Sequence, residues 1–120
     1  MEFALWAAAT FLALACFSAA GRKLIYRKVE LVETMPWAAG FSQRTIWAIA
    51  VAEIVGGIGL ILPELTGIFP ELTAVAAFCI AALQVGAAVV HARLREFSVI
   101  PVNVVLLCVA LFIGFGRLWF

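Results

Sequence analysis

Four long apolar stretches, separated by short segments rich in charge or proline, set the pattern of this chain. They cover residues 3–20, 45–62, 72–90 and 99–115. Each is close to the ~20 residues that a helix needs to cross the hydrocarbon core of a bilayer. Because backbone groups in lipid have no water to bond, segments of this kind cross the membrane as helices. The pattern predicts an all-α fold, a bundle of four transmembrane helices forming a single domain over residues 1–120.

Basic residues indicate how these spans are oriented. The first and third connections must lie on the same side of the membrane, and they hold most of the Lys and Arg residues: Arg22, Lys23, Arg27, Lys28, Arg44, Arg93 and Arg95. Arg117 falls on the opposite side. Cytoplasmic loops carry the excess of Lys and Arg in membrane proteins. We therefore expect a multi-pass protein of the inner (plasma) membrane with both termini outside the cytoplasm.

The connection between the first two spans has a helical pattern of its own. Ile25, Val29 and Val32 fall on one helical face, whereas Lys23 and Arg27 fall on the opposite one. A basic amphipathic segment is typical of a helix that lies in the membrane interface. We expect a short amphipathic cytoplasmic helix here, with a solvated turn as the alternative. Ser42, which follows this connection, is placed to cap the second span.

Composition supports a membrane protein and excludes several other classes. The chain is 67% hydrophobic and 12% charged, with a mean hydropathy of +1.18, whereas a soluble domain has about a quarter charged residues. A net charge of +1 does not indicate nucleic acid as a partner. Cys16, Cys79 and Cys108 lie inside apolar stretches and form no CxxC pair. Neither a redox motif nor a metal site is therefore indicated.

One acid interrupts the second apolar stretch. Glu53 has only apolar or glycine neighbours from residue 46 to residue 62. An ionised acid at the centre of a membrane helix costs roughly 2.5–3.5 kcal/mol on insertion scales, so intramembrane acids mark functional sites. Glu53 is therefore our first candidate for the site.

A few other polar residues lie within the spans or at their inner ends. At a rise of 1.5 Å per residue, Glu53, Gln84 and Asn103 lie roughly 12, 9 and 6 Å from the cytoplasmic ends of their helices. Gln84 and His91 are seven residues apart and share a helical face, as Glu53 and Gly57 do at a spacing of four. We expect a polar pocket that narrows from the cytoplasmic side toward Glu53. Its predicted ligand-binding residues are Glu53, Gln84, Asn103, Lys23 and Gly57.

The chemistry of Glu53 depends on its partner. As a neutral acid it donates a hydrogen bond to a carbonyl, and as a carboxylate paired with Lys23 or His91 it accepts one. Either state suits a quinone head group, a lipid carbonyl or proton relay. The structural alternative is that Glu53, Gln84 and Asn103 bond to one another as links between helices. In that alternative Lys23 extends to the lipid head groups and His91 is an interface residue.

Six short motifs follow one another along nearly the whole chain. They are AAGRKL at 19–24, MPW at 35–37, ExxGxxGLILP at 53–63, GxxxxH at 86–91, VN at 102–103 and GR at 116–117. In this order and spacing they resemble the DoxX-like family of small four-helix membrane proteins. Some relatives are subunits of a thiosulfate:quinone oxidoreductase, and others are placed with redox complexes or act as assembly factors. The matched polar positions are Lys23, Glu53, His91 and Asn103.

Three functions follow as hypotheses. The first is binding of a quinone or another lipophilic small molecule, as an accessory subunit of a membrane redox system. The second is a non-enzymatic scaffold or assembly factor that docks a partner membrane protein, or a second copy, through small-residue faces such as Ala52 and Gly56. The third is a small isomerase or hydrolase with Glu53 and His91 as catalytic acid–base residues. The sequence fixes no cofactor; a quinone or lipid is the class that it indicates.

Overall fold

Four helices make up the described part of the chain, which comprises residues 1–26 and 39–119 of a computed structural model. They are α1 (Glu2–Ile25), α3 (Gln43–Thr66), α4 (Glu71–Arg93) and α5 (Ile100–Trp119). All four are long and apolar enough to cross a membrane, and no strand occurs in these residues. The predicted bundle of four spans is confirmed. Most of the expected amphipathic helix falls on residues 27–38, outside the described residues, and its first residue, Lys23, belongs to α1.

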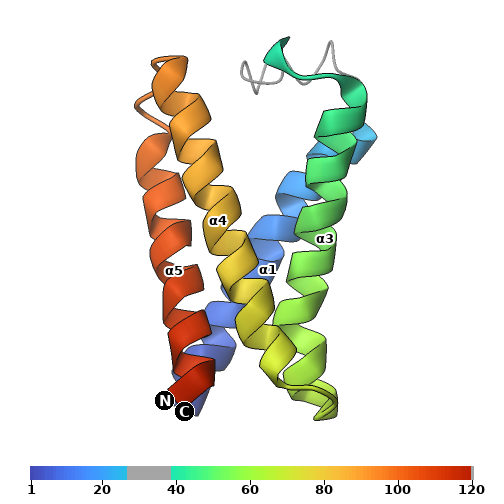
Figure 1. The fold of residues 1–120 in the computed structure, drawn as a ribbon, viewed down its shortest axis with the longest axis vertical. Coiled ribbons are helices and arrows are strands. Elements are labelled where there is room, and N and C mark those ends of the chain that lie inside the picture. Colours follow the sequence, from blue (N-terminus) through green and yellow to red (C-terminus); the bar gives the residue numbers. More distant parts are fainter. Residues whose placement is uncertain (27–38, 120) are drawn as a thin grey trace.

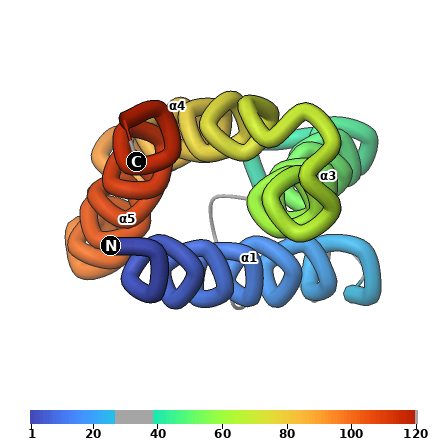
Figure 2. Tube along the Cα trace, turned by 90° about the horizontal axis from the view of Figure 1, so that it is seen from below, coloured from blue at the N-terminus to red at the C-terminus, as the bar shows by residue number. Residues whose placement is uncertain are grey.

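The helices form a closed ring in the order α1, α3, α4, α5, as the view along the bundle shows (Figure 2). Helices α4 and α5 lie side by side and form one pair, and α1 and α3 form the other (Figure 1). Both chain termini lie at the same end of the bundle, as an even number of spans requires. We refer to this end as the terminal end, and to the other as the open end.

Capping groups, rather than the edges of the apolar stretches, decide where the helices begin and end. The Ser42 hydroxyl accepts a hydrogen bond from the Thr45 amide at 3.2 Å, which confirms the predicted cap of α3. At its other end, α3 runs through Pro63 and continues to Thr66. It stops at Gly67, whose φ of 73° is a left-handed conformation that glycine adopts without steric cost. Proline removes one helical hydrogen bond but did not end this helix.

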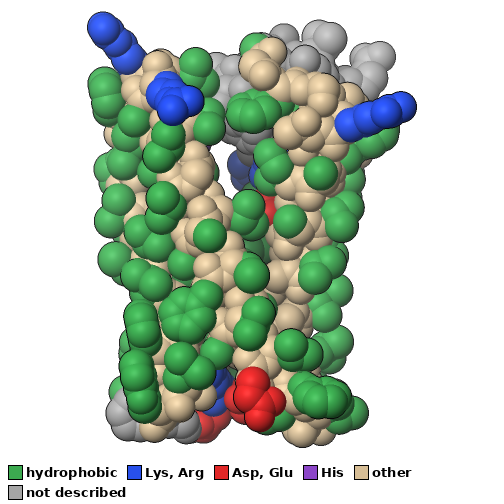
Figure 3. Space-filling model, in the orientation of Figure 1, with side chains coloured by type: hydrophobic (Ala, Val, Ile, Leu, Met, Phe, Trp, Pro, Cys, Tyr) green, Lys and Arg blue, Asp and Glu red, His purple; other side chains and the backbone are tan. Residues whose placement is uncertain are grey.

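The apolar core lies toward the terminal end. It consists of side chains that all four helices contribute: Ala9, Leu12, Ala13, Cys16, Leu60, Ala77, Ile80, Ala81, Ala110 and Ile113. Outside this core, large apolar side chains cover the surface of the bundle (Figure 3). A continuous apolar exterior of this kind is unstable in water and is what contact with lipid requires. The molecule is therefore a multi-pass membrane protein whose outer surface faces a bilayer.

Arg117 joins three helices at the terminal end. Its guanidinium donates to Glu2 Oε1 at 2.6 Å and lies 3.8 Å from Glu64 Oε2, while its carbon Cζ lies 5.3 Å from the centre of the Trp6 ring. The arginine side chain is only 4% exposed. Buried arginine with carboxylate and aromatic partners is a strong directional contact. It ties α5 to α1 and α3 at the end opposite the opening.

The small residues of α3 divide into two groups. Gly56 and Gly59 face α4, since a Cβ on them would lie 3.0 Å from Ile80 and 2.8 Å from the Cβ of Ala76. Ala48 and Ala52, which continue the same sequence pattern, are exposed. Close approach of α3 to α4 therefore depends on the two glycines, as expected for membrane helices that associate through small residues.

We expect Gly59→Ala to lower the free energy of unfolding, because the Ala76 Cβ is fixed to its backbone and α4 must move away. Gly86→Ala is the matched control, since nothing lies within 4 Å of a Cβ there. Both variants gain helix propensity of about 1 kcal/mol, which cancels in the comparison. The Gly59 variant should be less stable than the Gly86 variant by about 1–3 kcal/mol. Unfolding in mixed detergent micelles measures this, and equal stabilities would contradict the packing described.

Candidate functional site

A cavity of about 810 Å³ lies between the two helix pairs toward the open end. The pairs diverge in this direction (Figure 1), and the molecule is hollowed between α3 and α4, with basic and acidic side chains inside (Figure 3). Sites for small molecules measure about 300–1,000 Å³. All four helices line the cavity, mostly with apolar side chains, and its polar side chains include Lys23, Glu53, Gln84, His91 and Asn103. We refer to it as the polar cavity.

Five of the six predicted site residues therefore meet in one place. The exception is Gly57, which does not line the polar cavity. A Cβ at Gly57 would lie 2.7 Å from the ring of Phe17 in α1. Its lack of a side chain lets α1 approach α3, so we assign Gly57 to packing rather than to ligand contact.

Glu53 is paired with Lys23. The lysine Nζ donates to Glu53 Oε1 at 2.6 Å, and the two side chains are 7% and 12% exposed. Lys23 lies in the last turn of α1 and Glu53 at the middle of α3, so the pair crosses between the helices at the depth of the cavity. Of the alternatives open from the sequence, pairing with Lys23 is confirmed, and extension of Lys23 to the lipid head groups is wrong. A buried carboxylate needs such a partner to remain charged.

In the described part of the chain, the amides of Gln84 and Asn103 do not link the helices through side-chain hydrogen bonds. Within the described residues, neither Gln84 nor Asn103 makes a side-chain hydrogen bond, to Glu53 or to each other. Asn103 is only 7% exposed, and its Nδ2 is buried without a partner. The prediction that these residues satisfy one another as interhelical links therefore has no support in the geometry. An unpaired buried amide donor costs about 1–3 kcal/mol.

His91 has an acidic neighbour that sequence reasoning missed. Its Nδ1 lies 3.5 Å from Glu96 Oε1, beyond hydrogen-bond length, and both atoms are buried and unpartnered. Glu96 lies in the turn between α4 and α5 and lines the polar cavity. His91 is 8% exposed and lines the polar cavity. Glu53 and His91 line the same cavity, but the partner that Glu53 contacts is Lys23.

Among the described residues that line the polar cavity, the positive and negative charges are equal in number. Arg22 and Lys23 are basic, and Glu53 and Glu96 are acidic. In the part of the chain that the structure describes, no cluster of three or more His, Cys, Asp or Glu side chains could hold a metal ion. The site therefore offers hydrogen-bonding groups without a strong net charge.

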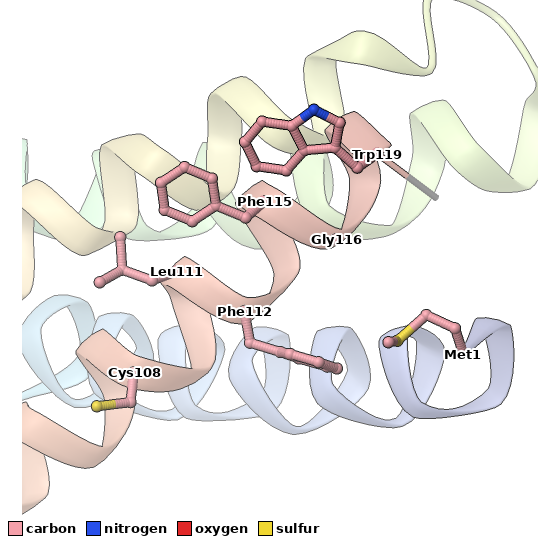
Figure 4. Close-up of a pocket in the computed structure, with 7 residues that line it drawn as sticks. All are labelled: Met1, Cys108, Leu111, Phe112, Phe115, Gly116 and Trp119. Atoms are coloured by element: carbon pink, nitrogen blue, oxygen red, sulfur yellow. The ribbon is translucent and has the colours of Figure 1, made fainter.

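A second hollow, of about 540 Å³, lies near the terminal end on α5. Figure 4 shows Phe115 and Trp119 on one side of it and Phe112 directed toward Met1. The Phe115 and Trp119 rings are stacked with their centres 5.5 Å apart. Its surface is almost wholly apolar and open to lipid. Since a binding site needs polar groups that orient the ligand, the polar cavity is the stronger candidate.

Comparison with known protein families gives a match over most of the chain. The sequence model of the DoxX-like family matches residues 7–113, a range that includes parts of all four helices. No curated protein and no solved structure matches the chain.

Proposed function

The chain belongs to the DoxX-like family, and we propose that it binds a quinone or another neutral lipophilic carbonyl compound in the polar cavity. The observation that carries this proposal is the buried, unpartnered Nδ2 of Asn103 in a cavity large enough for a head group and part of an apolar tail. A carbonyl oxygen would accept the hydrogen bond that Asn103 lacks. The apolar walls suit the remainder of such a molecule.

The charge balance supports a neutral head group. An anionic lipid would bring a phosphate close to the carboxylates of Glu53 and Glu96, and among the described residues that line the cavity only Arg22 and Lys23 offset this repulsion. Lys23 is already engaged by Glu53. A carbonyl needs no net positive site, because its oxygen accepts hydrogen bonds without carrying a charge.

The excess of basic residues in the connections at the open end supports a cavity that faces the cytoplasmic leaflet of the plasma membrane. In this orientation both termini lie outside the cytoplasm. A lipophilic ligand would reach the cavity from the bilayer, between the two helix pairs. We propose a binding role, as accessory subunit of a membrane redox system, rather than catalysis, since the Glu53 carboxylate is held by Lys23.

Mass spectrometry of small molecules retained after gentle purification tests the proposal. We expect the native protein to retain a lipophilic carbonyl compound and Asn103→Leu to lose most of it. Val104→Leu is the matched control, since Val104 is the next residue of α5 and is exposed away from the polar cavity. Recovery of phospholipid alone, in equal amounts from all three proteins, would refute the proposal.

Asn103→Leu should also raise the stability of the ligand-free protein, although it weakens ligand binding. Replacing an unpaired buried amide with an apolar side chain of similar size removes a cost, so the ligand-free protein should gain about 1 kcal/mol or more. Affinity for a short-chain quinone should fall about 5- to 50-fold, as for loss of one hydrogen bond. Unfolding titrations and equilibrium binding measure the two effects. A loss of stability would show that Asn103 supports the fold instead.

A further inference from the structure

The turn that follows α4 is a Schellman motif. The Glu96 amide donates to the His91 carbonyl at 2.8 Å, and the Arg95 amide donates to the Ala92 carbonyl at 3.1 Å. Between them Arg95 adopts a left-handed conformation with φ of 57°. These two hydrogen bonds around one left-handed residue define the motif. They fix the side chains of His91 and Glu96 next to each other at the end of α4.

In Schellman motifs these two positions frequently carry apolar side chains in contact. Here they carry an imidazole and a carboxylate, and both side chains line the polar cavity. His91 Nδ1 and Glu96 Oε1 are buried and lie at ion-pair distance, 3.5 Å apart, but neither atom has a hydrogen-bond partner among the described residues. Neither group satisfies the other, because hydrogen bonds of this type measure about 2.7–3.2 Å. Buried polar groups without a hydrogen bond are rare, and a third group bound by both side chains would account for this pair.

A hydroxyl group fits this requirement, because it accepts one hydrogen bond and donates another. We propose that His91 and Glu96 bind a hydroxyl of the ligand, with Nδ1–H donating to its oxygen and the hydroxyl hydrogen donated to Oε1. A carbonyl or ether oxygen can satisfy the imidazole but not the carboxylate. This inference rests on the proposed function and narrows it: among lipophilic carbonyl compounds, the site selects those that also carry a phenolic hydroxyl.

The test compares two redox-inert probes that both contain a carbonyl, a 4-hydroxyphenyl alkyl ketone and its methyl ether, in which a methyl group replaces the hydroxyl hydrogen. Equilibrium binding is measured on the full chain in micelles for the native protein, Glu96→Leu and Glu96→Gln. Leucine suits this position of the turn, so the fold should survive. We expect the native protein to prefer the phenol about tenfold or more, as for a hydrogen bond to a charged group. The preference should disappear in Glu96→Leu and decrease in Glu96→Gln.

The outcomes separate this inference from the proposed function. Equal binding of phenol and ether by the native protein would overturn the hydroxyl site and leave cavity binding intact. Binding of neither probe, although both carry the carbonyl that Asn103 would bind, would refute the proposed function itself. An undiminished preference in both variants would also overturn the assignment of Glu96. If Glu96→Leu fails to fold, the change in preference of Glu96→Gln decides, and an unchanged value contradicts the proposal.

Discussion

Lys23→Met should lower the free energy of unfolding by about 3–5 kcal/mol, since it leaves the Glu53 carboxylate buried without its partner. The two side chains are 7% and 12% exposed, so bulk water cannot replace the lost contact. Removing one member of a buried ion pair is much more costly than removing both. Unfolding of the variant in mixed micelles, followed by circular dichroism, measures the effect.

Two control variants make this prediction specific. Arg22→Met makes a similar change at the adjacent, exposed position and should cost about 0.5 kcal/mol or less. The double variant Lys23→Met with Glu53→Leu should recover most of the stability lost in the single variant, since no unpaired charge remains. If Lys23→Met costs less than about 1 kcal/mol, the pair behaves like an exposed salt bridge and the described burial is wrong.

Ala87→Phe should abolish ligand binding by filling the polar cavity. Ala87 lies in the middle of the α4 face that lines the cavity, close along the helix to Leu83 and His91. A phenyl ring there would occupy the space proposed for the ligand ring. We expect affinity for a short-chain quinone to fall by at least a hundredfold, about 2.8 kcal/mol. Equilibrium binding to the purified protein measures the loss.

Ala92→Phe is the matched control for this prediction. It places the same ring on the same helix, at an exposed position that does not line the cavity. This variant should bind as the native chain does. Equal affinity of the two variants and the native protein would show that the ligand, if bound, lies elsewhere.

The fold was predictable because the hydrophobic pattern of a membrane protein is strongly constrained. A segment in lipid must satisfy its own backbone, so four apolar stretches implied four helices. The positions of the helix ends were harder to predict from the sequence. The position of Pro63 suggested a break, yet α3 continues until Gly67, where a left-handed residue ends it. The end of a helix depends on local hydrogen bonds more than on hydropathy.

The candidate site was predictable where a polar residue stood out against apolar neighbours. Glu53, Gln84 and Asn103 were found in this way, and all line the polar cavity. Glu96 was missed, because one more acid in a charged turn carries no signal. Its place in the site follows from the left-handed conformation of Arg95, which turns the chain back over α4. Three-dimensional turn geometry of this kind is not visible in the residue pattern.

The sequence also could not show which side chain pairs with Glu53 or which helix covers each helical face. Helical spacing placed Gly57 on the same face as Glu53, yet the cavity takes only part of that face and α1 covers the rest through Phe17. Similarly, both Lys23 and His91 were available to pair with Glu53, and the choice depends on how α1 packs on α3. Helical periodicity shows on which side of a helix a residue lies, but not which other helix packs against that side.

An experimentally determined structure of the protein, purified from its own membranes in mild detergent, tests the central claim most directly. We predict elongated density of a bound molecule between the two helix pairs, with an oxygen atom at hydrogen-bonding distance from Asn103 Nδ2. The opposite result is a closed cavity in which Asn103 bonds to a neighbouring side chain such as Gln84. That result would show that the polar residues serve only to hold the helices together.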